Sequence, residues 1–237
     1  MFRVSTDISN LVKVFSLNTE YRLEVMTMEI ELKYKLNEAS DADAIFDDVR
    51  ILDMTDVGSE KHIKMHAVYF DTKDGNLSSK GMVFRVREEG EKLMATLKWD
   101  GVSIDGLHVR EEINVPLNDR VYLQRPDIKV FSESDIFEEL KSVVDGKELV
   151  LMMEMDFVRR AVRLDNGVGI FELSVDIGNI CCEGKTKQIN ELEIELFSGS
   201  NEELKDLGEY ISNKFKISPE NHSKFSQGLD LVDKNRV

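Results

Sequence analysis

The sequence predicts an α+β fold in which eight antiparallel strands close into a barrel, a tunnel with a charged lumen, and helices pack on the outside. Charged and apolar residues alternate in eight separate segments, and charges of both signs recur on the same faces. Three further segments have the apolar period of a helix. Charged strand faces cannot pack in a dry core without a large desolvation cost. A sheet closed on itself turns these faces toward water in its lumen and its apolar faces toward covering helices.

The first predicted strand begins at Glu29 and shows the alternation most clearly. Successive side chains of a strand point to opposite faces, so Glu29, Glu31 and Lys33 share one face. Ile30 and Leu32 share the other face. Mixed charges on one face, repeated from strand to strand, indicate a wet interior and a site for a charged ligand.

Seven more segments repeat this alternation. A turn at Asp165-Asn166-Gly167 joins the sixth and seventh strands of the predicted series as a hairpin. The eight predicted strands are residues 29–35, 68–71, 82–87, 93–99, 108–115, 151–164, 169–177 and 191–196.

Helices are predicted over residues 39–54, 134–144 and 201–215, where apolar residues recur at helical spacing. Ser40 and Asp41 lie near the start of the first helix and are good N-cap residues. Amphipathic helices of this kind would cover the apolar outer faces of the strands.

The composition excludes two classes of partner. The chain has 46 Asp and Glu against 31 Lys and Arg, a net charge of −15. Nucleic acids and anionic membrane surfaces would therefore be repelled over most of its surface. No apolar run is long enough for a membrane-spanning helix, and the adjacent Cys181 and Cys182 suit reduced thiols, so we expect a cytoplasmic protein. A monomer and a homodimer both fit the sequence.

Residues 1–27 stand apart from the rest, because no turn or cap links them to the first strand. They are assigned as an N-terminal extension of unknown role, either an arm of the protein or sequence upstream of the true start. Residues 28–237 are assigned to the tunnel domain.

Both signs of charge would meet in the lumen. The inward-facing cations would be Lys33, Arg85, Arg87, Lys98, Arg110 and Arg159, with Lys224 from the C-terminal segment. The inward-facing anions would be Glu29, Glu31, Glu112, Glu172, Asp176, Glu191, Glu193 and Glu195. Clustered Arg and Lys suit phosphate oxygens. Clustered carboxylates repel one another unless a divalent cation lies among them, and Mg²⁺ is commonly held by carboxylates plus substrate phosphates. The lumen therefore predicts a metal–polyphosphate site, in which Glu172 and Glu191 are the weakest members, with Glu191 expected at a strand's mouth.

An ordered series of motifs runs along these strands. Glu29-Ile30-Glu31-Leu32-Lys33 is followed by Tyr69-Phe70-Asp71-Thr72, Arg85-Val86-Arg87, Thr96-Leu97-Lys98, Arg110-Glu111-Glu112, Glu193-Ile194-Glu195 and Ser223-Lys224. This series resembles the CYTH, or triphosphate tunnel metalloenzyme, superfamily, whose signature is ExExK. The resemblance covers about residues 28–232 and looks closest to the bacterial inorganic triphosphatase branch, without the CHAD domain of longer members.

The resemblance implies a role for each residue of the lumen. The residues it implies for triphosphate binding are Lys33, Arg85, Arg87, Lys98, Arg110, Arg159 and Lys224. Those it implies for a first Mg²⁺ or Mn²⁺ are Glu29, Glu31, Glu193 and Glu195, with Glu112 and Asp176 near a second. The residues it implies for catalysis are Lys33, Arg85, Arg87, Lys98, Arg110, Glu112 and Arg159. The implied reaction is hydrolysis of a terminal phosphoanhydride, most simply of inorganic triphosphate to diphosphate and phosphate.

Two other functions stay open from the sequence. A class IV-type adenylate cyclase would use a similar lining, but it needs an adenine pocket, and no aromatic cluster is evident. A non-catalytic polyphosphate-binding module would not need the metal carboxylates. His108 faces inward, where a structural hydrogen bond and a proton-transfer role are both compatible with the sequence, and Trp99 is expected in the core outside the barrel.

Overall fold

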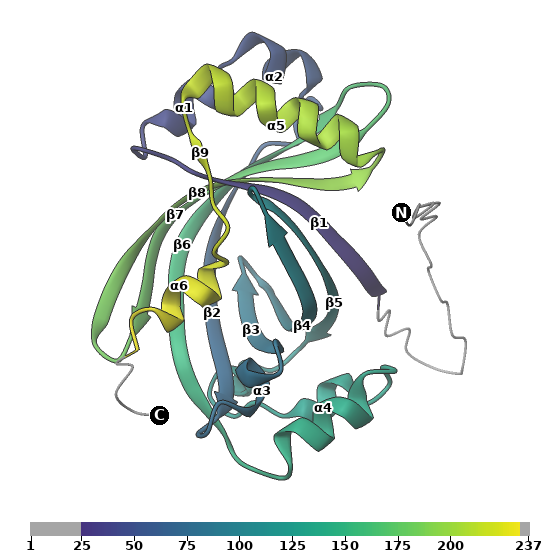
Figure 1. The fold of residues 1–237 in the computed structure, drawn as a ribbon, viewed down its shortest axis with the longest axis vertical. Coiled ribbons are helices and arrows are strands. Elements are labelled where there is room, and N and C mark those ends of the chain that lie inside the picture. Colours follow the sequence, from purple (N-terminus) through teal and green to yellow (C-terminus); the bar gives the residue numbers. More distant parts are fainter. Residues whose placement is uncertain (1–24, 233–237) are drawn as a thin grey trace, which may run out of the picture.

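The strands of the protein close into a barrel, as the computed structural model of residues 25–232 shows (Figure 1). The strands are β1 (Val25–Lys35), β2 (Lys61–Thr72), β3 (Val83–Glu89), β4 (Lys92–Ile104), β5 (Leu107–Leu117), β6 (Leu149–Asp165), β7 (Ile170–Cys182), β8 (Lys185–Ser198) and β9 (Ser218–Pro219). The α-helices are α1 (Asp41–Phe46), α2 (Val49–Met54), α3 (Asn76–Ser79), α4 (Phe137–Val144), α5 (Asn201–Phe215) and α6 (Lys224–Leu229). Two 3₁₀ turns cover Arg120–Leu123 and Ile128–Phe131.

The sheet order is β5-β4-β3-β2-β6-β7-β8-β1, and β1 also pairs with β5. This pairing closes an eight-stranded barrel in which every neighbouring pair is antiparallel. The ninth strand, β9, adds two residues to β1 outside the ring. The predicted closed antiparallel barrel is confirmed. Of the predicted N-terminal extension, residues 25–27 belong to β1, and residues 1–24 lie outside the described part of the chain.

Two apolar clusters bury the outer face of the barrel. One lies where β1, β7 and β8 pack under α1, α2 and α5, and includes Leu32, Leu173 and Ile194. The other lies at the opposite end, under α3, α4 and the 3₁₀ turns, and includes the expected core residue Trp99 together with Phe131 (Figure 1). Since these helices cover the apolar strand faces, the charged faces are left for the lumen.

A third apolar cluster lies inside the barrel. It joins inward-facing residues of β2, β6, β7 and β8, such as Tyr69 and Met155, with Phe225 of α6. The ring of Tyr69 stacks on that of Phe225 at 5.5 Å between centroids. Helix α6 therefore packs against the inner face of the sheet, and the lumen is apolar on this side and charged beyond it.

The predicted helix over residues 39–54 is wrong in its continuity, because the structure divides it into α1 and α2. Asp48 adopts an extended backbone and accepts hydrogen bonds from the N–H groups of Arg50 and Ile51, which starts a new helix. Its carboxylate also accepts a hydrogen bond from the Tyr210 hydroxyl, 2.9 Å away on α5. Asp48 thus ends one helix and caps the next.

The other two helix predictions agree better with the structure. The helix predicted from residue 134 begins at Phe137. Helix α5 covers the predicted residues 201–215, and its start is fixed by a capping box between Ser200 and Glu203. No helix among residues 25–232 is long and apolar enough to span a membrane.

The packing of α5 on β1 depends on a glycine. A methyl group at Gly208 would meet the Leu32 side chain and the Tyr34 hydroxyl. Ala normally stabilises a helix interior by about 1 kcal/mol relative to Gly, but overpacking costs about 1–3 kcal/mol. We expect Gly208→Ala to lower the melting temperature by several degrees. Asp206→Ala, on the exposed side of the same helix, is the control and should not lower it. A Gly208→Ala protein as stable as the wild type would contradict this packing.

Candidate functional site

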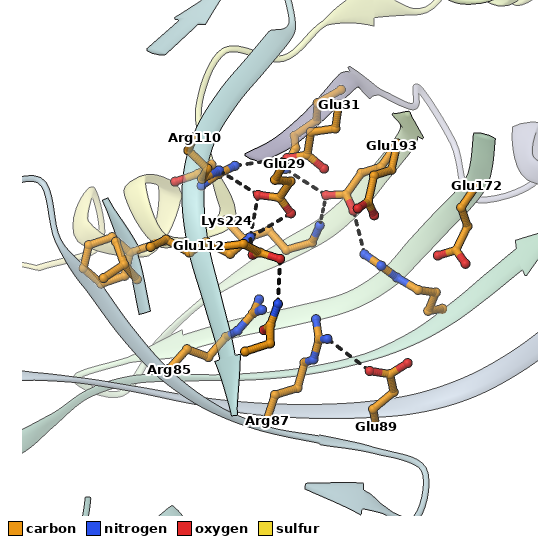
Figure 2. A pocket seen from close by; sticks show the side chains of 18 of the residues that line it. Glu29, Glu31, Arg85, Arg87, Glu89, Arg110, Glu112, Glu172, Glu193 and Lys224 are labelled. Atoms are coloured by element: carbon orange, nitrogen blue, oxygen red, sulfur yellow. Dashed lines mark hydrogen bonds and ion pairs between the residues drawn. The ribbon is translucent and has the colours of Figure 1, made fainter. Parts of the chain in front are cut away.

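A cavity of about 310 Å³ lies in the lumen and is open to solvent (Figure 2). Strand alternation brings the predicted side chains to it from β1 and from β3 to β8 in chain order, and α6 adds Lys224. The predicted residues that line it are Glu29, Glu31, Lys33, Arg85, Arg87, Lys98, Arg110, Glu112, Arg159, Glu172, Glu193, Glu195 and Lys224.

One part of the lumen is a compact ion-pair network centred on Glu193. Its carboxylate lies 2.8 Å from Lys33 Nζ, 2.7 Å from Lys224 Nζ and 2.6 Å from Arg159 Nη2. Burial opposes ionisation, but the three cations outweigh it and hold the pKa of Glu193 well below its usual value. Burial likewise opposes the charge of Lys33, whose pKa is nevertheless raised by its carboxylate neighbours. These buried charges therefore stay ionised.

A second network joins β1, β4 and β5. Lys98 Nζ lies 2.6 Å from Glu29 and 2.8 Å from Glu112. Arg110 lies 2.9 Å from Glu29 and 3.0 Å from Glu31. Burial would raise the pKa of Glu112, yet chiefly the charge and hydrogen bond of Lys98 lower it to about 2. Two cations thus lie between three carboxylates and offset most of their mutual repulsion.

Two arginines on β3 lack such compensation. Arg85 forms no ion pair with any described residue, and Arg87 pairs only with Glu89, at 3.0 Å. The Nε atoms of both are buried without a hydrogen-bond partner in the described chain. Burial and the positive charges of Arg85 and Arg159 lower the pKa of Arg87 to about 10. Figure 2 shows the two guanidinium groups side by side and directed toward the carboxylates. Both side chains thus have unmet donors, and the surroundings of Arg87 have an excess of positive charge, as at an anion site.

The carboxylate of Glu195, in contrast, lacks a positively charged partner in the described part of the chain. It forms no ion pair or hydrogen bond with the described residues, although it lies beside Glu29, Glu31 and Glu112. Burial and the charges of these three carboxylates raise its pKa to about 8. A divalent cation would relieve this repulsion, so the donor set fits a hard metal ion with oxygen ligands. No three acidic, His or Cys side chains of residues 28–232 already surround a metal position, because Lys98 and Arg110 occupy the nearby carboxylates.

Two predicted members of the lumen lie deeper than expected. Asp176 is fully buried and does not line the cavity. Its carboxylate accepts two hydrogen bonds of 2.7 Å from Arg159 and lies 2.8 Å from Lys224; its predicted approach to a second metal stays a prediction. The placement of Glu191 at a strand's mouth is wrong. It is 3% exposed and lies 2.8 Å from Lys224 Nζ, because the C-terminal segment covers it.

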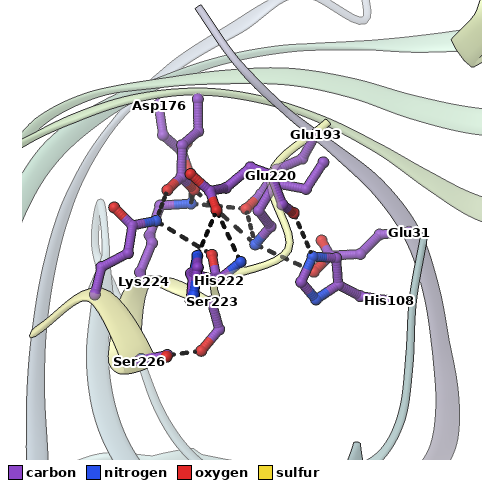
Figure 3. A network of polar contacts seen from close by, with 12 residues as sticks. Glu31, His108, Asp176, Glu193, Glu220, His222, Ser223, Lys224 and Ser226 are labelled. Atoms are coloured by element: carbon purple, nitrogen blue, oxygen red, sulfur yellow. Dashed lines mark hydrogen bonds and ion pairs between the residues drawn. The ribbon is translucent and has the colours of Figure 1, made fainter. Parts of the chain in front are cut away.

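His108 supports this C-terminal segment (Figure 3). Its Nε2 lies 2.8 Å from the carbonyl oxygen of Glu220, four residues before Lys224. The side chain of the next residue, Asn221, accepts a hydrogen bond of 2.8 Å from the Gly106 N–H. Burial and the nearby Lys33 lower the pKa of His108, which favours the neutral imidazole. Of the two roles that the sequence allows for His108, a structural hydrogen bond and proton transfer, the structure contains the hydrogen bond.

Sequence reasoning missed several residues of the cavity wall. Tyr69, Phe157 and Phe225 form part of it, so the lumen does contain the aromatic cluster that the sequence did not reveal. Asn114 also lines the cavity; it shares a strand face with Glu112, so the alternation rule alone could have found it. The aromatic residues had no such signal, because an inward-facing apolar residue reads like ordinary core.

Fold and cavity together define a β-barrel of the tunnel class, with a charged lumen enclosed by strands. Residues 27–226 match the CYTH domain family. The chain belongs to this family.

Comparison with individual proteins agrees with the family. The chain is 27% identical over 210 residues to an inorganic triphosphatase of Haemophilus influenzae, matching 89% of this chain and 56% of that protein. It thus spans little more than half the length of this curated relative. Among solved structures, a candidate adenylyl cyclase of Hippeastrum, described as having a dominant triphosphatase activity, has a TM-score of 0.66 at 22% identity, covering 86% of this chain and 98% of that one. A candidate adenylate cyclase of Bacillus halodurans has a TM-score of 0.54 at 19% identity, covering 84% and 97%. These two likenesses concern the fold.

The raised pKa of Glu195 predicts a pH-dependent stability. The folded protein keeps the proton up to pH of about 8, whereas the unfolded chain loses it near the ordinary value of 4.5. Between these values the free energy of unfolding falls as the pH rises, by at most about 1.4 kcal/mol per pH unit. In the presence of EDTA, Glu195→Gln should therefore become more stable than the wild type from pH 5 to pH 8, by about the same amount per unit.

Denaturant unfolding at each pH measures this difference. Glu209→Gln, an exposed substitution on α5, is the matched control and should follow the wild type at every pH. A Glu195→Gln protein whose stability relative to the wild type does not change with pH would show that the carboxylate is not held among like charges.

Proposed function

We propose that this protein is a divalent-metal-dependent hydrolase of a triphosphate phosphoanhydride bond, and that inorganic triphosphate is its preferred substrate. The observation that carries the proposal is the pairing of two unmet charges in one cavity. The Nε donors of Arg85 and Arg87 lack acceptors in the described chain, Arg87 also lacks sufficient anions, and Glu195 lacks a cation. A triphosphate with a divalent metal would complete both. The matched family and the inorganic triphosphatase relative support the same activity.

Substrate binding falls to the basic side chains. Arg85 and Arg87 would grip phosphate oxygens with their planar forks of donors. Lys33, Arg159 and Lys224 also line the cavity and would contact the substrate from the network around Glu193. Asp176 would act on the substrate indirectly, since its carboxylate fixes the directions of Arg159 and Lys224. Charge on the transferred phosphoryl group would then be stabilised by groups that are already in place.

The metal role belongs to Glu29, Glu31, Glu112 and Glu195, with Glu193 at their edge. When bound, Mg²⁺ or Mn²⁺ would supply charge stabilisation for the phosphoryl group and lower the pKa of the attacking water. In the protein alone, Lys98 pairs with Glu29 and Glu112, and Arg110 pairs with Glu29 and Glu31. Once these carboxylates hold a metal, Lys98 and Arg110 would be released toward the phosphates. The two networks would thus exchange partners without leaving a buried charge unpaired.

The cavity favours a substrate without a base. Tyr69 and Phe225 stack on each other and are 5% and 9% exposed, so neither offers an open ring face. A single observation favours the alternative of a nucleoside triphosphate substrate, as in an adenylate cyclase. Phe197, which lines the cavity, is 47% exposed and could stack on a base outside it.

One panel of substrates tests the proposal. The purified protein is given inorganic triphosphate, ATP or thiamine triphosphate with Mg²⁺ or Mn²⁺, and both released phosphate and cyclic AMP are measured. We expect phosphate from inorganic triphosphate at the highest kcat/KM, no cyclic AMP, and loss of turnover in EDTA that added Mg²⁺ reverses. EDTA removes the ion held by the carboxylates but should leave triphosphate binding to the arginines measurable by calorimetry.

The other outcomes of this panel select other functions. Cyclic AMP from ATP would identify a cyclase. Binding of triphosphate without turnover under any metal condition would identify a binding module. Turnover that survives exhaustive chelation would contradict the metal assignment, since Glu195 would then need no cation.

Arg87 offers a substitution that separates binding from stability. Because burial and neighbouring cations disfavour its charge, Arg87→Gln should not lower the free energy of unfolding. It should weaken triphosphate binding by about tenfold or more, since a hydrogen-bonded charge pair contributes about 1.5–3 kcal/mol. Arg163→Gln, a half-exposed arginine of β6 that pairs with Asp56 at 3.0 Å, is the control. Equal affinities of the two variants would rule out Arg87 as a phosphate ligand.

A further inference from the structure

Asn114 connects the carboxylate of Glu112 with the side of the lumen where Arg85 lies. It lies on β5, two residues after Glu112 on the same inward face, and it lines the cavity. Across the sheet it is the register partner of Thr96 on β4, which is itself the partner of Arg85 on β3. Three neighbouring strands thus place Arg85, Thr96, Asn114 and Glu112 in one row.

The contacts along this row all run in one direction. Arg85 Nη2 lies 3.4 Å from Thr96 Oγ1, a long contact. The Thr96 hydroxyl donates to Asn114 Oδ1 at 2.7 Å, and Asn114 Nδ2 donates to Glu112 Oε1 at 2.7 Å. Each group donates toward the carboxylate, so the row forms a polarised chain from a cation to an anion.

The chemistry of the row requires an amide at its centre. A carboxylate can only accept, so the amide must turn its Nδ2 to Glu112 and its Oδ1 to Thr96. The Thr96 hydroxyl, on a residue with no exposed surface, must then give its proton to Oδ1 and face Arg85 with its lone pairs. An Asp side chain would place a second carboxylate beside Glu112, and an apolar side chain would leave the buried hydroxyl unpaired.

We propose that Asn114 is a positioning residue, which fixes the Glu112 carboxylate and, through Thr96, the Arg85 guanidinium. This inference rests on the proposed function, in which Glu112 serves the metal and Arg85 the phosphates. The other oxygen of Glu112 lies 2.8 Å from Lys98. When Lys98 turns to the substrate, Asn114 is left to hold Glu112 in place. Arg85 lines the cavity, and its long contact with Thr96 is a side-chain hydrogen bond that holds its guanidinium within the described chain.

Three substitutions and one control test this role. Asn114→Ala removes both arms of the row, and Thr96→Val removes only the arm toward Arg85. Thr96→Ser keeps the hydroxyl and is the conservative rescue. Asn179→Ala, on the exposed outer face of β7, is the matched control. For each protein we would measure kcat and KM for inorganic triphosphate with Mg²⁺, the melting temperature, and calorimetric binding of triphosphate in EDTA.

The expected pattern is a split between rate and binding. Asn114→Ala should lower kcat by about tenfold, because it frees the carboxylate, and should also weaken triphosphate binding in EDTA. Thr96→Val should weaken triphosphate binding with a smaller effect on kcat. Thr96→Ser and Asn179→Ala should remain within about twofold of the wild type in kcat and in triphosphate affinity.

Several results would overturn the inference. Asn114→Ala with kcat and affinity within twofold of the wild type would do so. Thr96→Ser as damaging as Thr96→Val would also do so, because the loss would then come from packing and not from the hydroxyl. A wild-type protein that binds triphosphate without turnover would refute the proposed function, and the calorimetric comparison alone would then decide on Asn114. A wild-type protein that does neither would overturn both.

Discussion

The structure depends on one constraint: charged side chains removed from bulk water must be neutralised by other charges or by a ligand. Closing the sheet on itself concentrates carboxylates, guanidinium groups and ammonium groups in one lumen. The two outer apolar clusters under the helices, and the smaller cluster around α6 inside the barrel, provide the apolar burial that the charged part of the lumen cannot provide. Each strand that lines the charged part of the lumen therefore needs an apolar outer face and a charged inner face, and a shift of one residue in register would move the charged side chains into the core and the apolar ones into the lumen.

The charges of the lumen are not balanced equally in all places. One region is balanced by the protein itself, and the other is suited to bind a ligand. Around Glu193 each cation has its anions within hydrogen-bonding distance, so the charges of this region are balanced before any ligand binds. Around Arg85, Arg87 and Glu195 the balance is left open. The open region lowers the stability of the empty protein, and under the proposed function that loss is recovered when metal and triphosphate bind.

Strand alternation carried most of the prediction. The parity of Glu29, Glu31 and Lys33 determines which side chains enter the lumen, and the barrel follows from the cost of burying them elsewhere. The sequence could not predict that Glu191 is buried, because the side chains that cover it belong to α6, more than thirty residues later in the chain. It also could not divide the helix at Asp48, whose carboxylate accepts a hydrogen bond from a distant tyrosine on α5. Both errors arise from contacts between segments far apart in sequence, which local periodicity does not contain.

The path of the segment after α5 has a consequence for folding order. It leaves β9 on the outside of the ring, is held by His108 at Glu220, and enters the lumen to deliver Lys224 to Asp176, Glu191 and Glu193. Those three carboxylates belong to β7 and β8, which are synthesised earlier. While the chain emerges from the ribosome, this acidic group lacks one of its counter-ions until residue 224 is available. The pairing that closes the barrel involves only β1 to β8, whereas the charge balance around Glu193 also needs the C-terminal segment in place.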